Sequence, residues 1–337
     1  MGLRAVVLVG GKGTRLQPLT FTRPKPILPV GGVPMLSRKI AHLAAHGVTE
    51  AVLSLGYKPD PFIEAFPGNT INGVKLYYAI ESEPLDTAGA LKFAADFAGF
   101  LNGADDSPII GVNGDVLTDL DLSAQVDFHS AKGAEATIAL TQVEDPSAFG
   151  VVPTDDEGRV IAFVEKPPRD EAPTDWINAG AYVLNPAFFR RIPDGKVSLE
   201  RAVFPLLVAD KTLFAVHSPE YWIDAGIPST YLQANLDMAA RERGGSIVHP
   251  TATVSAGAVV RNSVIGAGVV IGDGSIIDQS VIDDGAVVDP GCTITNSMIG
   301  LRATIGSNST LRELTVVGDD AVVAANAVLD AAKVERA

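Results

Sequence analysis

Aliphatic residues recur every six positions from residue 247 to residue 329, and this period constrains the fold more than any other feature. The spacing slips by one residue at Ile282 and again at Ile299. A period of six predicts a parallel β-helix, in which each six-residue rung forms one side of a coil and its aliphatic residue points inward; three rungs per coil give about five coils. The aliphatic positions are Ile247, Val259, Ile265, Ile271, Ile277, Ile282, Val288, Ile294, Ile299, Ile305, Leu311, Val317, Val323 and Leu329, and Thr253 stands in the same phase.

Glycine and asparagine accompany these rungs and suit tight corners, some of them with positive φ. Gly follows the aliphatic residue at positions 266, 272, 300, 306 and 318, and Asn stands at 262, 296, 308 and 326. The single cysteine, Cys292, falls in a rung, where we expect a small apolar filler. One cysteine excludes an intramolecular disulfide and fits a reducing compartment.

Residues 1–240 follow a different pattern, in which apolar runs alternate with helical spacing. Such alternation predicts an α/β fold: a Rossmann-like, mostly parallel sheet with helices on both faces. Ligands of such sheets lie at the carboxyl ends of strands. We expect strands at 5–9, 51–55, 74–79 and 109–112, helices at 35–46 and 88–97, and a linking helix at 231–243. Two domains follow, 1–240 and 246–337, the second a β-helix.

The charge of the chain is unevenly distributed. Residues 1–49 hold seven basic side chains and no acidic one, although the formal net charge of the chain is −14. The overall charge argues against broad nucleic-acid binding, whereas a local cationic patch suits a small polyanion. We expect Arg38 and Lys39 to lie on a solvated helix face instead. The seven are Arg4, Lys12, Arg15, Arg23, Lys25, Arg38 and Lys39.

A glycine-rich string, residues 8–16, follows the first expected strand. Such a turn lets backbone N–H groups approach a phosphate closely. Leu16 stands where the dinucleotide fingerprint needs a small residue, and the chain has no P-loop motif. Arg15 offers a planar fork for phosphate oxygens, and Lys25, between Pro24 and Pro26, adds a point charge. The alternative is a plain glycine turn with exposed cations.

The string resembles the signature of the sugar-1-phosphate nucleotidyltransferases, and in particular that of the mannose-1-phosphate guanylyltransferases. Further segments resemble that family in order and spacing, and the left-handed hexapeptide β-helix of its two-domain members extends the resemblance to the C-terminus. These segments are Glu83–Gly89, Asn113–Asp115, Phe149–Val152, Glu165–Pro167, Asn178–Gly180 and Trp222–Gly226.

The resemblance implies a nucleotidyltransferase catalytic domain that joins a nucleoside triphosphate to a sugar 1-phosphate and releases pyrophosphate. Two anions must meet in this reaction, so a Mg²⁺ ion held by Asp115 and Asp224 would bridge their phosphates. Arg15 and Lys25 would stabilise the charge of the departing pyrophosphate. The nucleotide-binding residues implied are Leu8, Gly10, Gly11, Gly13, Thr14, Glu83 and Gly89. The sugar-phosphate residues implied are Gly150, Glu165, Lys166, Asn178 and Gly180.

Glu83 bears on the choice of base. The Watson–Crick edge of guanine presents two adjacent donors, N1–H and N2–H₂, that one carboxylate can accept together. The expected reaction is therefore GTP with mannose 1-phosphate to give GDP-mannose. Against this, Glu83 or Glu81 could cap a turn or face water, and Asp86 stands where a guanylyltransferase is expected to carry Gly.

Three other functions stay open at this stage. The chain could be a glucose-1-phosphate adenylyl-, uridylyl- or thymidylyltransferase, or a non-catalytic partner subunit that binds a nucleotide sugar. The third alternative is a bifunctional enzyme whose β-helix transfers acyl groups. Such sites usually need a catalytic His on a coil, and here His249 stands only at the entrance of the β-helix. No apolar run is long enough for a membrane span, and we expect a cytoplasmic homo-oligomer that binds neither membrane nor nucleic acid.

Overall fold

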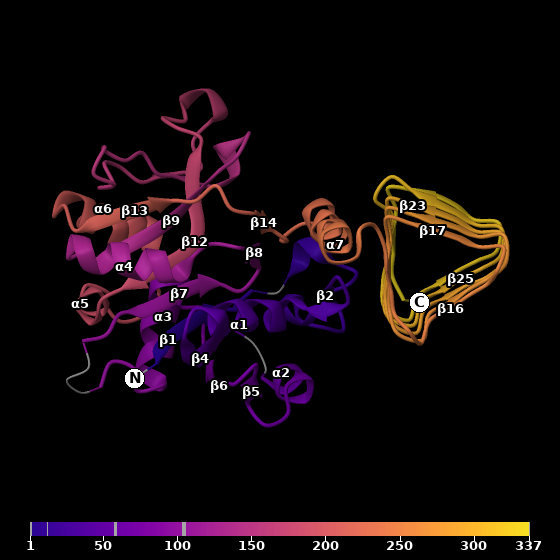
Figure 1. The fold of residues 1–337 in the computed structure, drawn as a ribbon, viewed down its shortest axis with the longest axis horizontal. Coiled ribbons are helices and arrows are strands. Elements are labelled where there is room, and N and C mark those ends of the chain that lie inside the picture. The colour runs from indigo at the N-terminus through magenta and orange to yellow at the C-terminus, as the bar shows by residue number, and fades with distance from the viewer. Residues whose placement is uncertain (1, 12, 57–58, 103–105, 337) are drawn as a thin grey trace. The chain divides into compact units, whose positions relative to one another are not determined.

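The computed structural model describes residues 2–11, 13–56, 59–102 and 106–336. By its contacts the chain divides into two compact units. Figure 1 labels their helices and strands. The first consists of Met1–Gly11 and Leu36–Trp222, and the second of Lys12–Met35 and Ile223–Ala337. Arg15, Arg23 and Lys25 therefore belong to the same unit as the C-terminal residues. The other basic residues described in the first 49 positions, Arg4, Arg38 and Lys39, belong to the first unit. The domain ranges expected from the sequence, 1–240 and 246–337, stay a prediction.

A single mixed sheet organises the first unit. Ten strands of the described residues form it, in the order β11-β10-β12-β7-β1-β4-β6-β5, with β9 pairing both β12 and β13. The strands β7, β1, β4 and β6 run parallel, and β12 is antiparallel to β7 and β9. The strands are β1 Leu3–Leu8, β4 Val48–Leu55, β5 Thr70–Ile71, β6 Val74–Ile80, β7 Ile109–Asn113, β9 Ala136–Gln142, β10 Gly150–Val151, β11 Val164–Glu165, β12 Trp176–Leu184 and β13 Leu213–His217; the short β8 is Val116–Thr118.

Helices cover both faces of this sheet, as the sequence predicts. Side chains alternate between the faces of a strand. On β9, Ile138 joins the core that α3, α5 and α6 share, whereas the neighbouring Thr137 is hydrogen-bonded to His129 of α4. The helices are α1 Met35–Ala45, α2 Asp60–Ala65, α3 Asp86–Phe97, α4 Leu122–Lys132, α5 Pro186–Arg190 and α6 Phe204–Ala209, with short turns η3 Pro146–Ala148, η4 Arg169–Glu171 and η5 Leu199–Val203.

The second unit begins with a compact loop region and a long helix. The loop region holds the short helices η1 Thr14–Leu16 and η2 Lys25–Ile27 and the paired strands β2 Pro29–Val30 and β3 Val33–Pro34. After β14, Trp222–Asp224, helix α7 spans Pro228–Arg243 and ends at Gly244, whose φ of 69° is left-handed. Glycine adopts that conformation without strain. The linking helix expected at 231–243 is therefore confirmed and starts three residues earlier.

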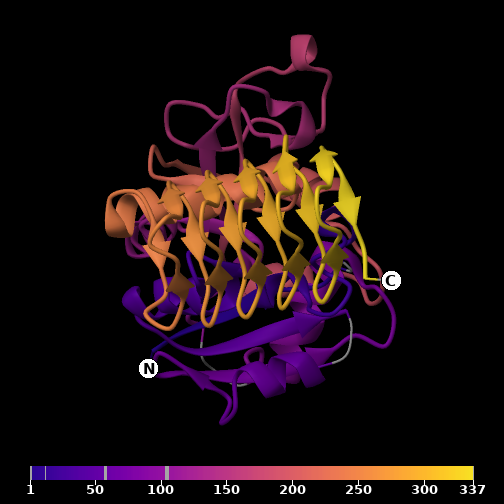
Figure 2. The ribbon, with the colours of Figure 1, turned by 90° about the vertical axis from the view of Figure 1, so that its right-hand side faces the viewer.

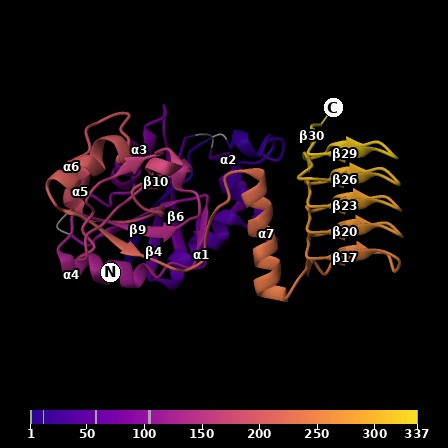
Figure 3. The ribbon, with the colours of Figure 1, turned by 90° about the horizontal axis from the view of Figure 1, so that it is seen from above.

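The β-helix follows α7 and has the predicted architecture, a stack of coils with one short strand on each of three sides (Figure 2). Its three parallel sheets hold six, five and five strands in the described residues. Figure 3 shows the strands of one side, β17, β20, β23, β26 and β29, one above another. The strands are β15 Ile247–Val248, β16 Thr253–Val254, β17 Val259–Arg261, β18 Val264–Ile265, β19 Val270–Ile271, β20 Ile276–Asp278, β21 Val281–Ile282, β22 Val287–Val288, β23 Thr293–Thr295, β24 Met298–Ile299, β25 Thr304–Ile305, β26 Thr310–Arg312, β27 Val316–Val317, β28 Val322–Val323, β29 Val328–Asp330 and β30 Lys333–Val334.

The predicted inward phase is confirmed from Ile265 to Val323, where these aliphatics form one buried cluster. It is wrong by one residue in the first coil. There the partners of Ile265, Ile271 and Ile277 are Val248, Val254 and Val260, not Ile247, Thr253 and Val259. This coil is 17 residues long, so the step from Val260 to Ile265 is five residues and not six. Counting back from Ile265 by six therefore gives Val259, whose side chain points outward.

Asparagine and glycine occupy corners of the β-helix for different physical reasons. The predicted asparagines, 262, 296, 308 and 326, all have positive φ. Gly272 and Gly306, in contrast, avoid a clash, because a side-chain carbon added to either would lie 2.5 Å from a backbone nitrogen of the next coil. Cys292 is buried in its rung as expected, and its backbone N–H donates to Ser275 Oγ of the preceding coil. In the part of the chain that the structure describes, no helix has the length and apolar character needed to cross a membrane.

Candidate active site

In the first unit, neighbouring parallel strands end at one edge of the sheet, and the predicted nucleotide-binding residues Gly10, Gly11 and Glu83 follow them. Gly10 and Gly11 of the glycine-rich string follow β1 and are both exposed, and Gly11 has a φ of 110°. A side-chain carbon on Gly10 would lie 3.8 Å from Gly56 N and 4.0 Å from Glu81 Oε1, beyond the ends of β4 and β6. Leu8, half-buried in β1, accepts a hydrogen bond from Gly114 N at 2.8 Å.

Asp115 follows β7 at this edge, as the sequence predicts. Gly114 before it must be glycine, since a side-chain carbon there would lie 2.5 Å from Val9 Cγ1 and 2.9 Å from Leu8 O. Burial lowers the pKa of Lys39 to about 8, against the opposing attraction of the Asp115 carboxylate. The expectation that Lys39 lies on a solvated face is therefore wrong, because Lys39 is only 4% exposed. It shares the buried face of α1 with Leu36, three residues before it, and Leu43, four residues after.

In the segment after β6, Glu81 and Glu83 have different environments, so the structure distinguishes the two glutamates that could cap a turn. Glu81 accepts hydrogen bonds from Ser54 Oγ at 2.9 Å and from Leu85 N at 3.0 Å, so it caps the turn. Glu83 is exposed. Asp86 has a φ of 61°, a left-handed conformation that glycine adopts most easily, which explains why Gly is expected there. Gly89 is buried in α3 against the carbonyl oxygen of Gly195.

Three neighbouring strands bring together the residues expected to bind the sugar phosphate. Gly150 of β10 lies opposite Glu165 of β11, and Val151 lies opposite Ile177, beside Asn178 of β12. Glu165 Oε1 lies 3.4 Å from Nζ of the exposed Lys166. Asn178 accepts from Gly180 N and donates to the hydroxyl of Tyr182, both at 2.9 Å.

The sugar segments also adjoin the strand that leads to Asp115. Gly180 has a φ of 72°, and a side-chain carbon there would lie 2.5 Å from the side-chain nitrogen Nδ2 of Asn113. The indole N–H of Trp222 donates to Ala179 O at 2.9 Å, and its ring packs edge-on against Phe149 with centroids 5.7 Å apart. The first unit therefore places Gly10, Gly11 and the predicted base and sugar segments around one end of its sheet.

In the second unit, Gly226 is the point around which three predicted residues meet. A side-chain carbon at Gly226 would lie 2.7 Å from Asp224 Oδ1, 2.9 Å from Arg15 Nη2 and 3.2 Å from Lys25 Nζ. Lys25 Nζ itself lies 3.9 Å from Asp224 Oδ1, and the lysine is 8% exposed. The carboxylate provides opposite charge for an ammonium that would otherwise be costly to bury. This cluster joins two cations and a carboxylate from segments two hundred residues apart in sequence.

We call residues 13–28 the cationic segment. Gly13 opens it with a φ of 60°, and its carbonyl accepts a hydrogen bond from Thr20 Oγ1 at 2.8 Å. Space is tight there, since a side-chain carbon on Gly13 would lie 3.3 Å from Lys25 Cβ. Thr14 and Arg15 are exposed in η1. Lys12 lies outside the described residues.

Two residues of the second unit do not stand out as site residues in the sequence. Gly226 stands there only inside a motif, and Arg23 only among the basic side chains. In the structure Gly226 adjoins Asp224, Arg15 and Lys25, and Arg23 pairs with Asp283 and Asp319. Asp115 belongs to the first unit and Asp224 to the second, so their shared metal ion stays a prediction. Within the described residues, no three His, Cys, Asp or Glu side chains cluster as a metal site.

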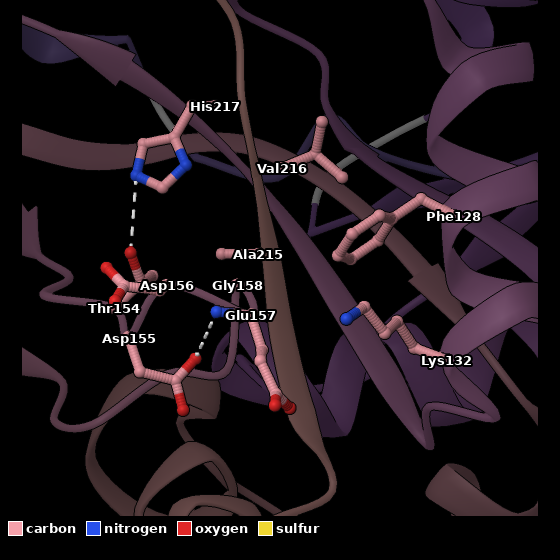
Figure 4. A pocket seen from close by; sticks show the side chains of 10 residues that line it. All are labelled: Phe128, Lys132, Thr154, Asp155, Asp156, Glu157, Gly158, Ala215, Val216 and His217. Carbon is pink, nitrogen blue, oxygen red and sulfur yellow. Dashed lines mark hydrogen bonds between the residues drawn. The ribbon is translucent and has the colours of Figure 1, made fainter.

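A pocket of about 600 Å³ lies elsewhere in the first unit (Figure 4). His217 faces Thr154 on one side at 3.4 Å, and Lys132 lies near the Phe128 ring on the other, with Nζ 5.6 Å from its centroid. Residues 154–158 also line the pocket, and three of them, Asp155, Asp156 and Glu157, carry carboxylates. None of the residues that line it is a predicted site residue.

Two family models together match nearly the whole chain. The nucleotidyl transferase model matches residues 4–241, and the GMPPB C-terminal domain model matches residues 243–336.

Similar proteins agree with these matches. The chain is 42% identical to a mannose-1-phosphate guanylyltransferase of Mycobacterium tuberculosis over 78% of this chain and 75% of that protein. It is 41% identical to a mannose-1-phosphate guanyltransferase of Schizosaccharomyces pombe over 68% of this chain and 62% of that protein. The crystal structure of HddC from Yersinia pseudotuberculosis complexed with GMP-PN is similar, with 31% identity and a TM-score of 0.59 over 71% of this chain and all of that one.

Proposed function

The chain belongs to the nucleotidyl transferase family, and from that premise we propose that it transfers GMP from GTP to mannose 1-phosphate, giving GDP-mannose and pyrophosphate. A phosphate oxygen of the sugar phosphate attacks the α-phosphorus of GTP, a new P–O bond forms, and the bond from the α-phosphorus to the β-phosphate oxygen breaks. The reaction needs no covalent enzyme intermediate, because positioning and charge stabilisation supply most of the catalysis.

The meeting of Arg15, Lys25 and Asp224 around Gly226 is the observation that carries this proposal. Negative charge grows on the leaving pyrophosphate, and fixed cations stabilise it best where water is scarce. The buried Lys25 supplies a fixed charge, and the exposed Arg15 supplies a fork that matches phosphate oxygens. The glycine between them leaves the space that a side chain would otherwise fill.

The donor set fits Mg²⁺. Hard cations prefer oxygen ligands, and Mg²⁺ is commonly held by one or two carboxylates together with substrate phosphates. We propose Asp115 and Asp224 as those carboxylates. When bound, the ion would neutralise phosphate charge and orient both substrates.

The choice of guanine and mannose has two supports. Two relatives at 41–42% identity carry mannose-1-phosphate guanylyltransferase or guanyltransferase as their names, and the similar HddC structure holds GMP-PN. In this chain Glu83 is exposed, while Glu81 is engaged by Ser54 and Leu85. Glu83 is therefore the glutamate we assign to the donor edge of guanine, and Glu165, Lys166 and Asn178 are the residues we assign to the sugar phosphate.

A substrate panel tests the proposal. Purified protein with Mg²⁺ is given each of GTP, ATP, UTP and dTTP with mannose 1-phosphate or glucose 1-phosphate, and pyrophosphate release is measured. We expect the highest kcat/KM with GTP and mannose 1-phosphate, and loss of activity with EDTA that added Mg²⁺ restores. Preference for another pair would replace the substrates, and no pyrophosphate from any pair would favour a non-catalytic partner subunit. The homo-oligomer and the cytoplasmic location expected from the sequence remain predictions.

A further inference from the structure

Arg23 of the cationic segment lies in a buried ion network with two aspartates of the β-helix. Its Nη2 donates to Asp283 Oδ2 at 2.6 Å and to Asp319 Oδ1 at 2.9 Å, and its Nε donates to Asp319 Oδ2 at 3.0 Å. The side chain of Arg23 is 19% exposed, that of Asp283 9% and that of Asp319 1%. All three residues belong to the second unit.

The β-helix itself holds the two carboxylates in place. Asp283 Oδ1 accepts from Asp284 N at 2.8 Å, and Asp319 Oδ1 accepts from Leu301 N at 2.9 Å. The aspartates follow β21 and β27, which are separated in their sheet by β24 alone. At the corner after β24 stands Gly300, where a side-chain carbon would lie 2.7 Å from Asp319 Oδ1. The glycine therefore leaves room for the carboxylate of a neighbouring coil.

The main effect that we expect of this network is to fix the position of Arg23, and not to stabilise the fold. Burial opposes the charge of Arg23, but the carboxylates of Asp283 and Asp319 outweigh it and raise the pKa of the guanidinium. Buried ion pairs often contribute little net stability, because removing the charges from water costs about as much as their attraction returns. Bidentate pairing of a planar guanidinium does fix direction as well as distance.

The network lies close in sequence to Lys25. Only Pro24 separates Arg23 from Lys25, and Pro26 follows, so the backbone between the network and the ammonium has few conformations. Thr22 Oγ1 also donates to Asp319 Oδ2. Earlier in the segment, Pro18 packs on the corner at Gly318, where an added carbon would lie 2.9 Å from Pro18 Cβ. The β-helix thus contacts the cationic segment at two places, at Pro18 and at Thr22–Arg23.

We propose that Arg23 is a positioning residue for the transfer reaction: clamped by Asp283 and Asp319, it fixes the cationic segment so that Lys25 and Arg15 stay at Gly226. The inference rests on the proposed function, in which those two cations stabilise the departing pyrophosphate. It makes the β-helix part of the catalytic apparatus, since two of its corners determine where a substrate-facing cation lies.

The test uses full-length variants that remove the clamp. Arg23→Gln alone leaves two buried carboxylates without their cation and can fail to fold. The triple variant Arg23→Gln, Asp283→Asn, Asp319→Asn removes all three charges together and retains similar shapes. Arg312→Gln is the matched control, because it breaks another arginine–aspartate pair of the β-helix, with Asp330. Among the described residues, the ion pair of Arg312 is with Asp330 and not with the cationic segment.

Two readouts are taken on folded protein. We expect kcat for pyrophosphate release by the triple variant to fall about 10- to 100-fold, as misplacement near one ångström does. KM for mannose 1-phosphate should change little. Hydrogen exchange of the backbone amides in residues 13–28 should become faster. Arg312→Gln should keep the wild-type kcat and exchange.

The outcomes separate this inference from the proposed function. A folded triple variant with wild-type kcat overturns the inference, and so does unchanged exchange in residues 13–28. A fall in kcat together with faster exchange supports it. If the wild-type protein itself releases no pyrophosphate, the proposed function fails, and hydrogen exchange alone decides whether Arg23 holds the cationic segment.

Discussion

Gly226→Ala is the substitution that most directly tests the cluster of Arg15, Lys25 and Asp224. The added carbon would lie 2.7 Å from Asp224 Oδ1 and 2.9 Å from Arg15 Nη2. Ordinary contacts begin at 3.4 Å. The carboxylate oxygen must therefore retreat by about 0.7 Å and the guanidinium nitrogen by about 0.5 Å, with a smaller shift at Lys25.

These shifts should cost activity and spare the fold. The displaced atoms are the ends of flexible side chains, which can rotate away without moving the backbone. A misplacement near one ångström at a reacting centre costs up to about 100-fold in rate. We therefore expect kcat/KM to fall about 10- to 100-fold, which corresponds to about 1.4–2.7 kcal/mol in the activation barrier.

The assay is pyrophosphate release from GTP and mannose 1-phosphate with Mg²⁺, combined with thermal unfolding followed by circular dichroism. The expected result is a lower kcat/KM at an unchanged Tm. Wild-type kcat/KM in the alanine variant would show that the geometry around Gly226 does not matter for the reaction. A large drop in Tm would show that Gly226 serves the fold instead.

Three further predictions concern stability and are read from thermal or urea unfolding. Gly89→Ala should lower the free energy of unfolding by about 1–3 kcal/mol, because the new carbon would lie 2.3 Å from the carbonyl oxygen of Gly195; a loss of activity at unchanged stability would instead support a nucleotide-binding role. Asp86→Ala should cost about 1–2 kcal/mol at the left-handed φ of 61°, and Asp86→Gly should cost less. Burial, and then the charge of Lys39, lower the pKa of His42 to about 4. The unfolded chain therefore binds more protons between pH 6.5 and 4, so His42 contributes stability above pH 6.5 that is lost as the pH falls. His42→Gln should remove up to about 3 kcal/mol of this pH dependence, and equal acid sensitivity of both proteins would contradict the assignment.

The β-helix could be predicted closely because its physics is local and repeated. Each coil buries one aliphatic residue per side, so the period appears directly in the sequence, and the buried positions from Ile265 to Val323 agree with it. The error in the first coil has the same origin. A period reports spacing but not where a step of five replaces a step of six, and the outward Val259 and the inward Val260 are both valine.

The candidate site could be predicted only where a motif is contiguous. The glycine string, Asp115, Asp224 and the sugar segments each stand in a short run with its own chemistry. The charge of Lys39 predicts a solvated position, but its place between Leu36 and Leu43 on the buried face of α1 determines where it lies. The left-handed φ of Asp86 explains why glycine is expected there, and no neighbouring residue signals that φ.

No sequence pattern links Arg23 to its two partners, and this affects where the protein can be divided for experiments. Its partners, Asp283 and Asp319, are 36 residues apart in sequence and become neighbours only because coils stack with one turn between them. Neither aspartate stands in a motif that points to the cationic segment. Cutting the chain at residue 240, where the change of period suggests a boundary, would remove both carboxylates and leave the guanidinium without its clamp. An inactive fragment 1–240 would therefore say nothing against catalysis by that part of the chain, because the cut removes the groups that hold Lys25 in place.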